Sequence, residues 1–112
     1  MCKRRGPILA AVYAIITEIT ARPAVAADAT AQRETEEFLL LRASRPGFKG
    51  HVVVDAGGGR TIVLVLWDSA AAATAARQAL EPVAARLWGD LWASPPRVLG
   101  AGKVRHLTPL SG

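Results

Sequence analysis

Asparagine is absent from this chain of 112 residues, and cysteine, histidine and aromatic side chains are scarce. The single Cys2 cannot form an internal disulfide, which favours a reducing compartment. Two histidines, His51 and His106, and one terminal thiol are too few for a zinc site. No Ser-His-Asp set and no catalytic pair of carboxylates can be assembled either. The sequence therefore predicts no metal site and no hydrolase triad.

Long apolar runs are also missing, since no segment reaches the roughly 18 apolar residues of a transmembrane helix. Residues 1–27 nevertheless imitate a secretory signal, with a basic run at 3–5, an apolar stretch at 8–16 and small residues at 24–26. The polar spacer before those small residues is long for such a signal, and the apolar stretch is needed as the first strand of the fold. We therefore expect a cytoplasmic protein that does not enter the membrane.

Basic residues outnumber acidic ones and give a net charge of +5, but residues 3–5 form the only basic run. The other basic residues stand singly among acids, as Arg33 does beside Glu34. The chain has no basic helix, and it lacks the interleaved aromatic and basic residues that single-strand binders use. Solvated surface charge is the expected role of these residues, and no nucleic-acid partner is predicted.

The residues that are present predict six elements of secondary structure. β-Branched residues dominate the strand candidates, while the second helix has an apolar face at helical spacing from Leu80 to Leu91. The predicted strands are 8–20, 48–55, 60–67 and 97–107, and the predicted helices run from Pro23 or Asp28 to Ala43 and from Asp68 or Ser69 to residue 94.

This order, β-α-β-β-α-β, is the split βαβ arrangement. It predicts a ferredoxin-like α+β fold, in which a four-stranded antiparallel sheet carries two helices on one face. Residues 8–108 then form a single domain. Residues 1–7 are expected to be a disordered basic N-terminus, and residues 109–112 a tail.

Glycine and proline refine this outline at three places. The segment at 56–59 is expected to be a tight hairpin turn; a phosphate-binding loop would need a helix directly after the glycines, and a strand follows instead. Pro82 removes one backbone donor, so it should kink the second helix or start another. Gly100 and Gly102 weaken the last strand and suggest a bulge or an edge position.

The central hairpin is apolar on both of its faces. In its first strand, Val52 and Val54 point one way and Val53 points the other. Two helices can cover only one face, and an antiparallel sheet with a wet second face would alternate apolar and polar residues. The uncovered face therefore predicts a homodimer through the sheet face, with a two-fold axis. The second strand divides in the same way, into Ile62, Leu64 and Leu66 on one face and Val63, Val65 and Trp67 on the other.

Two segments resemble the antibiotic biosynthesis monooxygenase-like family. The segment at 46–58, PGFKGHVVVDAGG, resembles that family's Pro-Gly-Phe turn followed by an apolar strand and a glycine turn. The segment at 62–69, IVLVLWDS, is similar to its third strand running into the second helix. Members of that family are dimeric α+β barrels. The resemblance covers about residues 10–108. It implies the same fold that the order of elements predicts, and the same homodimer that the two apolar faces of the hairpin predict.

The wider superfamily includes branches with different chemistry. Its haem-degrading branch has an Asn on the first strand, a Trp on the third and a His ligand on the second helix. Trp67 matches this pattern, but the chain has no Asn, and residues 69–94 contain no His, which argues against haem degradation. The monooxygenase branch oxidises phenolic polyketides with dioxygen and without metal or flavin. The resemblance therefore implies no cofactor and a small aromatic ligand.

The expected site is an apolar cleft between the sheet and the helices. His51 is the candidate catalytic residue, because a histidine can act as a base near neutral pH. The candidate ligand-binding residues are Tyr13, Trp67, Trp88 and Trp92. The competing interpretation is a non-catalytic homodimeric module with a filled core, in which Trp67 and Trp88 are packing residues and His51 lies at the surface.

Overall fold

The computed structural model describes residues 12–22 and 29–108. The segments 1–11, 23–28 and 109–112 lie outside the described residues, and with them the predicted N-terminus, the predicted start of the first helix and the tail. The elements are β1 (Tyr13–Thr20), α1 (Ala29–Ala43), β2 (Phe48–Gly57), β3 (Arg60–Trp67), α2 (Ala70–Trp88), the short 3-10 helix η1 (Gly89–Leu91) and β4 (Arg97–Lys103).

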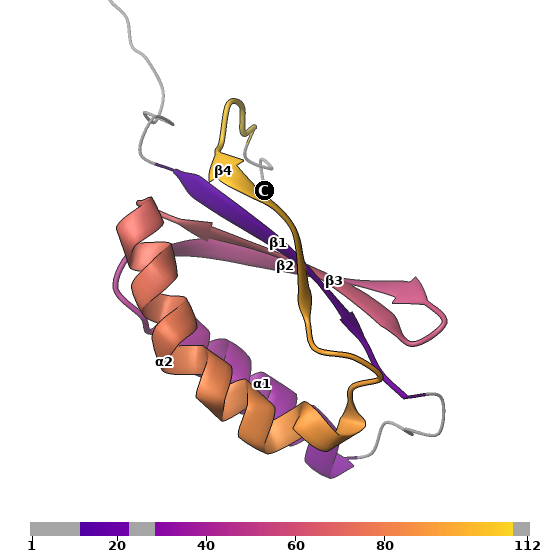
Figure 1. Cartoon of the computed structure of the whole chain (residues 1–112). Coiled ribbons are helices and arrows are strands. Elements are labelled where there is room, and N and C mark those ends of the chain that lie inside the picture. Colours follow the sequence, from indigo (N-terminus) through magenta and orange to yellow (C-terminus); the bar gives the residue numbers. More distant parts are fainter. Residues whose placement is uncertain (1–11, 23–28, 109–112) are drawn as a thin grey trace, which may run out of the picture.

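The strands form one antiparallel sheet in the order β2-β3-β1-β4, and both helices pack on the same face of it (Figure 1). The predicted β-α-β-β-α-β order and the ferredoxin-like α+β fold are therefore confirmed. Among the described helices, none combines the length and the apolar character that a bilayer span requires.

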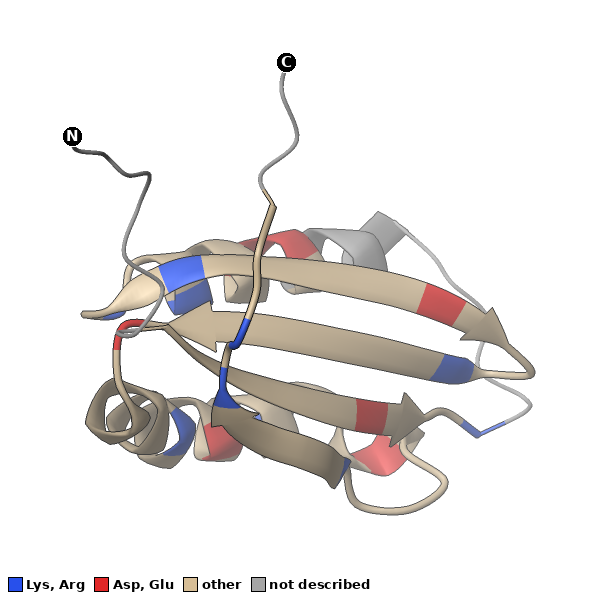
Figure 2. Ribbon diagram, turned by 90° about the horizontal axis from the view of Figure 1, so that it is seen from above, with Lys and Arg blue, Asp and Glu red and all other residues tan. Residues whose placement is uncertain are grey.

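The hairpin between β2 and β3 has the turn that the glycines predict. Gly58 and Gly59 form the turn itself. The Asp55 carboxylate accepts a hydrogen bond of 2.9 Å from the Gly57 backbone N–H, which fixes the chain as it enters the turn. The hairpin end projects beyond the two helices (Figures 1 and 2), so this part of the sheet has no helix beneath it.

Helix α2 begins as predicted but does not break at its proline. The Ser69 hydroxyl caps the helix by accepting a 3.0 Å hydrogen bond from the Ala72 backbone N–H. The helix then runs without interruption through Pro82 to Trp88, so of the two effects expected of Pro82, the start of a second helix is wrong. Pro82 and Gln78, whose carbonyl loses its helical donor, both lie on the exposed side of the helix, where water can replace the missing bond.

Small residues allow α2 to approach the sheet closely. Ala73 and Ala76 are each only 1% exposed, and Leu80 continues the same buried stripe. A larger side chain at either alanine position would push the helix away from the strands. The buried core comprises Ile15, Phe38, Val63, Val65, Trp67, Ala73, Ala76 and Leu80.

The strand register confirms the predicted division of the central hairpin into two faces. Val63, Val65 and Trp67 are buried under the helices, whereas the alternate residues of β3 point to the opposite side. Val52 and Val54, 55% and 47% exposed, lie on that opposite side with them. We call this surface the open face; its apolar residues are Ala14, Ile16, Val52, Val54, Ile62, Leu64 and Leu66.

The edge strand β4 is shorter than predicted and carries the expected bulge. It ends at Lys103 rather than at Leu107. Gly100 pairs with Ile16, but the next residue of β1 pairs with Val98, which leaves Leu99 as the extra residue.

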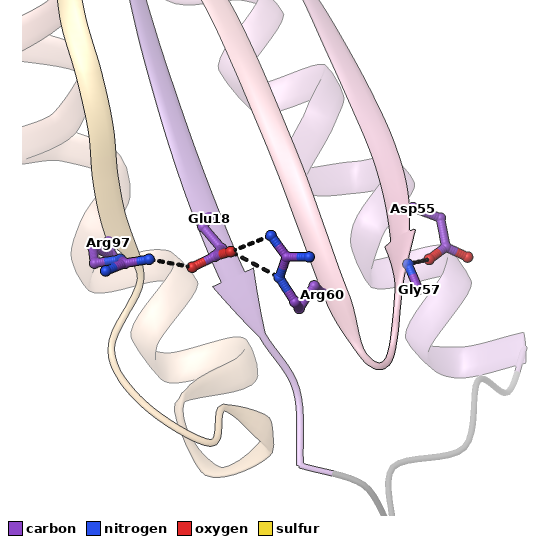
Figure 3. Close-up of polar contacts among 5 residues, drawn as sticks. All are labelled: Glu18, Asp55, Gly57, Arg60 and Arg97. Carbon is purple, nitrogen blue, oxygen red and sulfur yellow. Dashed lines mark hydrogen bonds and ion pairs between the residues drawn. The ribbon is translucent and has the colours of Figure 1, made fainter.

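One ion-pair cluster lies on the strands at the end of the open face (Figure 3). Glu18 of β1 accepts hydrogen bonds from Arg60 at 2.6 Å and from Arg97 at 2.9 Å. These two guanidinium groups hold the pKa of the Glu18 carboxyl below its usual value. Charged positions are otherwise sparse along the strands (Figure 2), so the open face is mainly apolar.

Candidate functional site

A bulge at the start of β2 decides which way His51 points. Phe48 pairs with Trp67 and His51 pairs with Val65, although the two β2 residues are three positions apart. Regular alternation would send Phe48 and His51 to opposite faces. The extra residue at the bulge reverses the alternation, so both side chains lie on the helix side of the sheet.

Gly50 makes this bulge possible. Its φ of +153° belongs to a backbone region that other residues rarely adopt. A Cβ atom on Gly50 would meet nothing within 4 Å, so the requirement for glycine comes from the backbone and not from lack of space.

Aromatic residues cluster with His51 at this end of the sheet, and Phe48 contacts it directly. The Phe48 ring lies edge-on to the His51 ring with centroids 5.1 Å apart, and edge-on to Trp67 at 5.8 Å. Trp67 is 3% exposed, and Tyr13 pairs with it across β1 and β3. The structure thus brings together three of the predicted site residues, Tyr13, His51 and Trp67, and adds Phe48.

The two tryptophans near the end of α2 lie elsewhere. Trp88 packs edge-on against Phe38 of α1, with centroids 4.9 Å apart, and forms part of the wall of the core. Trp92 follows η1 and forms an isolated bridge with Ala21, just past the far end of β1. Tyr13 and Ala21 are therefore about 26 Å apart along the strand, at about 3.3 Å per residue. Trp92 does not join the group around His51.

Arg42, near the end of α1, is a neighbour of His51 that the sequence interpretation missed. Its guanidinium carbon lies 5.2 Å from the centroid of the Phe38 ring, a cation–π geometry. Phe38 and Arg42 are four residues apart on one helix, a spacing that predicts such a contact. Burial lowers the pKa of Arg42. Burial, and then the positive charge of Arg42, lower the pKa of His51, so its imidazole is neutral at pH 7.

Three buried nitrogen atoms in this region have no hydrogen-bond partner among the described residues: Nη1 of Arg42, Nε of Arg45 and Nδ1 of His51. A buried polar group without a partner costs about 1–3 kcal/mol, and more if it is charged. Such groups in a folded protein call for an explanation, and a ligand, an ion or water can supply one. Chemically, the arrangement offers a neutral imidazole, aromatic surfaces and a cationic side chain.

Comparison with known proteins places this arrangement on a known fold. No family model and no curated protein matches the sequence. The structure is similar to a protein of unknown function, NE2512 from Nitrosomonas europaea, with a TM-score of 0.73, 15% identity, and coverage of 93% of this chain and 99% of the other. For a candidate antibiotic biosynthesis monooxygenase from the same organism, the TM-score is 0.71 and the sequence identity is 14%. The match covers 92% of this chain and 99% of the other.

SnoaB, a cofactor-independent oxygenase from Streptomyces nogalater, is a further structural match. Its TM-score is 0.65 with 18% identity, and the match covers 90% of this chain and all of SnoaB. At this level of identity the comparisons establish the fold. The chain has the antibiotic biosynthesis monooxygenase-like fold, and the resemblance in the sequence is confirmed to that extent.

Proposed function

We propose that this chain, built on the antibiotic biosynthesis monooxygenase-like fold, is a cofactor-independent monooxygenase acting on a small aromatic or polyketide-type phenol. The observation that carries the proposal is His51, whose pKa is lowered and whose ring lies edge-on to Phe48, which in turn lies edge-on to Trp67. The structural match to SnoaB, which is named a cofactor-independent oxygenase, supports the same reaction class.

In the proposed reaction, His51 removes a proton from the phenol or its keto form. The resulting anion is electron-rich enough to transfer an electron to dioxygen, and the two radicals then combine to form a carbon–oxygen bond. Protonated His51 returns its proton to the peroxide anion, and loss of water from the resulting hydroperoxide gives the quinone. One oxygen atom of dioxygen enters the product and the other leaves as water, while the substrate carbon skeleton supplies all four electrons.

The aromatic residues have a supporting role in this proposal. Tyr13, Phe48 and Trp67 would hold the flat rings of the substrate against the helix side of the sheet, with Trp88 further along the wall. Ring stacking of this kind favours an aromatic ligand over an aliphatic one. We leave Trp92 outside the proposed site because it lies at the opposite end of β1.

Substitution of His51 tests the mechanism. We expect His51→Ala to lower the rate of oxygen uptake with an anthrone by about 100- to 10,000-fold, the usual contribution of a general base. His106→Ala is the matched control, because His106 is exposed and contacts Thr108 near the C-terminus. Turnover unchanged in His51→Ala would remove His51 from the mechanism. A wild-type protein that consumes no oxygen with anthrones or phenols would refute the oxygenase itself.

A second candidate function is a non-catalytic homodimeric module. The burial of Trp67 favours it, because a residue that is 3% exposed behaves as packing unless a ligand displaces its neighbours. A crystal structure decides between the two: an enzyme needs a cavity of about 300 Å³ or more beside His51 and Trp67. A solid core there would favour the module.

We also propose that the protein is a cytoplasmic homodimer that associates through the open face. Val52 and Val54 are exposed there, and Leu64 and Leu66 lie beside them on β3. A second copy related by a two-fold axis would cover the same apolar residues on both chains at once. The single cysteine of the chain supports the assignment to a reducing compartment.

A further inference from the structure

The corner formed by the end of α1, the following turn and the start of β2 holds an unusual concentration of unpaired polar groups. Arg42, Arg45 and His51 are each half-buried. In each of them one nitrogen atom is buried and has no hydrogen-bond partner among the described residues. All three groups can donate a hydrogen bond, and two of them are permanently charged at neutral pH.

A chain of short contacts joins these residues. The Arg45 backbone N–H donates to the Arg42 carbonyl at 3.1 Å, and the Phe48 N–H donates to the Arg45 carbonyl at 3.2 Å. The Phe48 ring in turn lies 5.1 Å from the His51 ring. The charge of Arg42 is close enough to His51 to shift its pKa downwards. Arg42 and His51 are therefore neighbours beside the rings of Phe38 and Phe48, and Arg45 lies in the turn that leads to Phe48.

Three other arginines of the described part of the chain are paired with carboxylates, and the three that are not, Arg22, Arg86 and Arg105, are exposed to solvent. Arg60 and Arg97 bind Glu18, and Arg77 binds Glu81 on the outer side of α2. Arg42 and Arg45 have no such partner among the side chains that the structure describes, at 12–22 and 35–108. The negative end of the α1 dipole favours a cation at this position. It does not explain why these nitrogens are buried without an acceptor.

We propose that Arg42 and Arg45, assisted by His51, bind the carboxylate group of an aromatic acid whose rings lie against Phe48. A guanidinium group matches a carboxylate with two parallel hydrogen bonds, and burial strengthens the pair. The inference rests on the proposed function in one respect, because it places this ligand in the same site and defines the substrate as an aromatic carboxylic acid.

Wild-type protein alone provides the first test, by isothermal titration calorimetry at neutral pH. The two probes are 1-hydroxy-2-naphthoate and 1-naphthol, which share the ring system and the hydroxyl group and differ in the carboxylate. We expect the acid to bind about ten- to a hundredfold more tightly, as hydrogen bonds to charged groups allow. Equal affinity for the two probes, or no binding of the acid, would overturn the proposal.

Arg42→Met provides the second test. It keeps an apolar stem on Phe38 but removes the guanidinium, so affinity for the acid should fall about ten- to a hundredfold while affinity for 1-naphthol stays the same. Arg77→Met removes an equal charge from the exposed side of α2 and should change neither affinity. If Arg42→Met binds the acid as tightly as Arg77→Met does, Arg42 does not bind the carboxylate and the proposed site is refuted.

Thermal unfolding of the ligand-free variants distinguishes binding from a structural role. Removal of an unpaired buried charge is expected to leave the melting temperature of Arg42→Met unchanged or raised, whereas a structural arginine would lower it. The outcome is also separable from that of the oxygenase. Tight binding of the acid without oxygen uptake would support the carboxylate site and refute the oxygenase. Oxygen uptake with equal affinity for both probes would support the oxygenase and refute the carboxylate site.

Discussion

His51 takes its chemical character from neighbours that are far away in the sequence. Phe48 presents a ring edge to it, and Arg42 approaches from the end of α1. Burial and the guanidinium both disfavour the protonated imidazole, so the pKa of His51 lies below its ordinary value of 6.5. A histidine in this state accepts protons at neutral pH, and that is what a general base requires.

This shift predicts the pH dependence of the reaction. Because only neutral His51 can accept a proton, kcat/KM should fall as pH decreases through the pKa of His51. Since that pKa is lowered, the midpoint should lie below 6.5, and the rate should be level at neutral pH. Removal of the Arg42 charge should move the midpoint upwards. Oxygen uptake measured across the acidic range checks both expectations, and a midpoint above 6.5 in the wild type would contradict them.

At the scale of elements, one irregularity organises the site. The bulge in β2 brings Phe48 and His51 to the same side of the sheet, and Gly50 adopts the positive φ that the bulge needs. The preceding turn is equally constrained, because a Cβ on Gly47 would lie only 2.6 Å from the Ala72 Cβ of α2. The glycines at 47 and 50 thus fix how the chain passes from α1 into β2.

Replacement of Gly50 tests the role of the bulge. We expect Gly50→Ala to lower the free energy of unfolding by about 1–3 kcal/mol, because alanine is strained at a φ of +153°. Gly89→Ala is the matched control: it also has open space around it, but its φ of −54° suits alanine. Urea unfolding compares the two variants. Equal stability of the two would show that the bulge does not depend on glycine.

At the scale of the whole molecule, the sheet has one covered and one uncovered apolar face. The helices bury Val63, Val65 and Trp67, and nothing in the described chain covers Val52 or Val54. The cluster of Glu18, Arg60 and Arg97 pairs its charges within the chain. The open face can therefore be buried against a second copy without leaving those charges unpaired.

Two adjacent valines on β2 give a matched test of the dimer. Val52 lies on the open face and Val53 on the helix side, and they are 55% and 46% exposed. We expect the wild type to have twice the chain mass of 11.8 kDa in light scattering. Val52→Glu should give the monomer mass, because it buries two like charges at the two-fold axis, whereas Val53→Glu should remain dimeric. A wild-type monomer, or two variants that behave alike, would refute the interface.

Local sequence patterns determined the fold of this protein. Alternation divides the residues of β3 between two faces, the glycines mark the hairpin turn, and Ser69 marks the start of α2. These features depend on neighbours within a few residues, so the sequence alone is sufficient to predict them. Pro82 is the exception, because its effect depends on whether water can reach the carbonyl that it leaves unpaired.

The site was decided by tertiary structure. His51, Trp67 and Tyr13 are predictable as candidates, but the bulge that joins Phe48 to His51 depends on how β2 pairs with β3. The separation of Trp92 from the others follows from its bridge to Ala21. The unpaired nitrogens of Arg42 and Arg45 are visible only when all neighbours are in place, because a hydrogen bond depends on distances between atoms that sequence spacing does not specify.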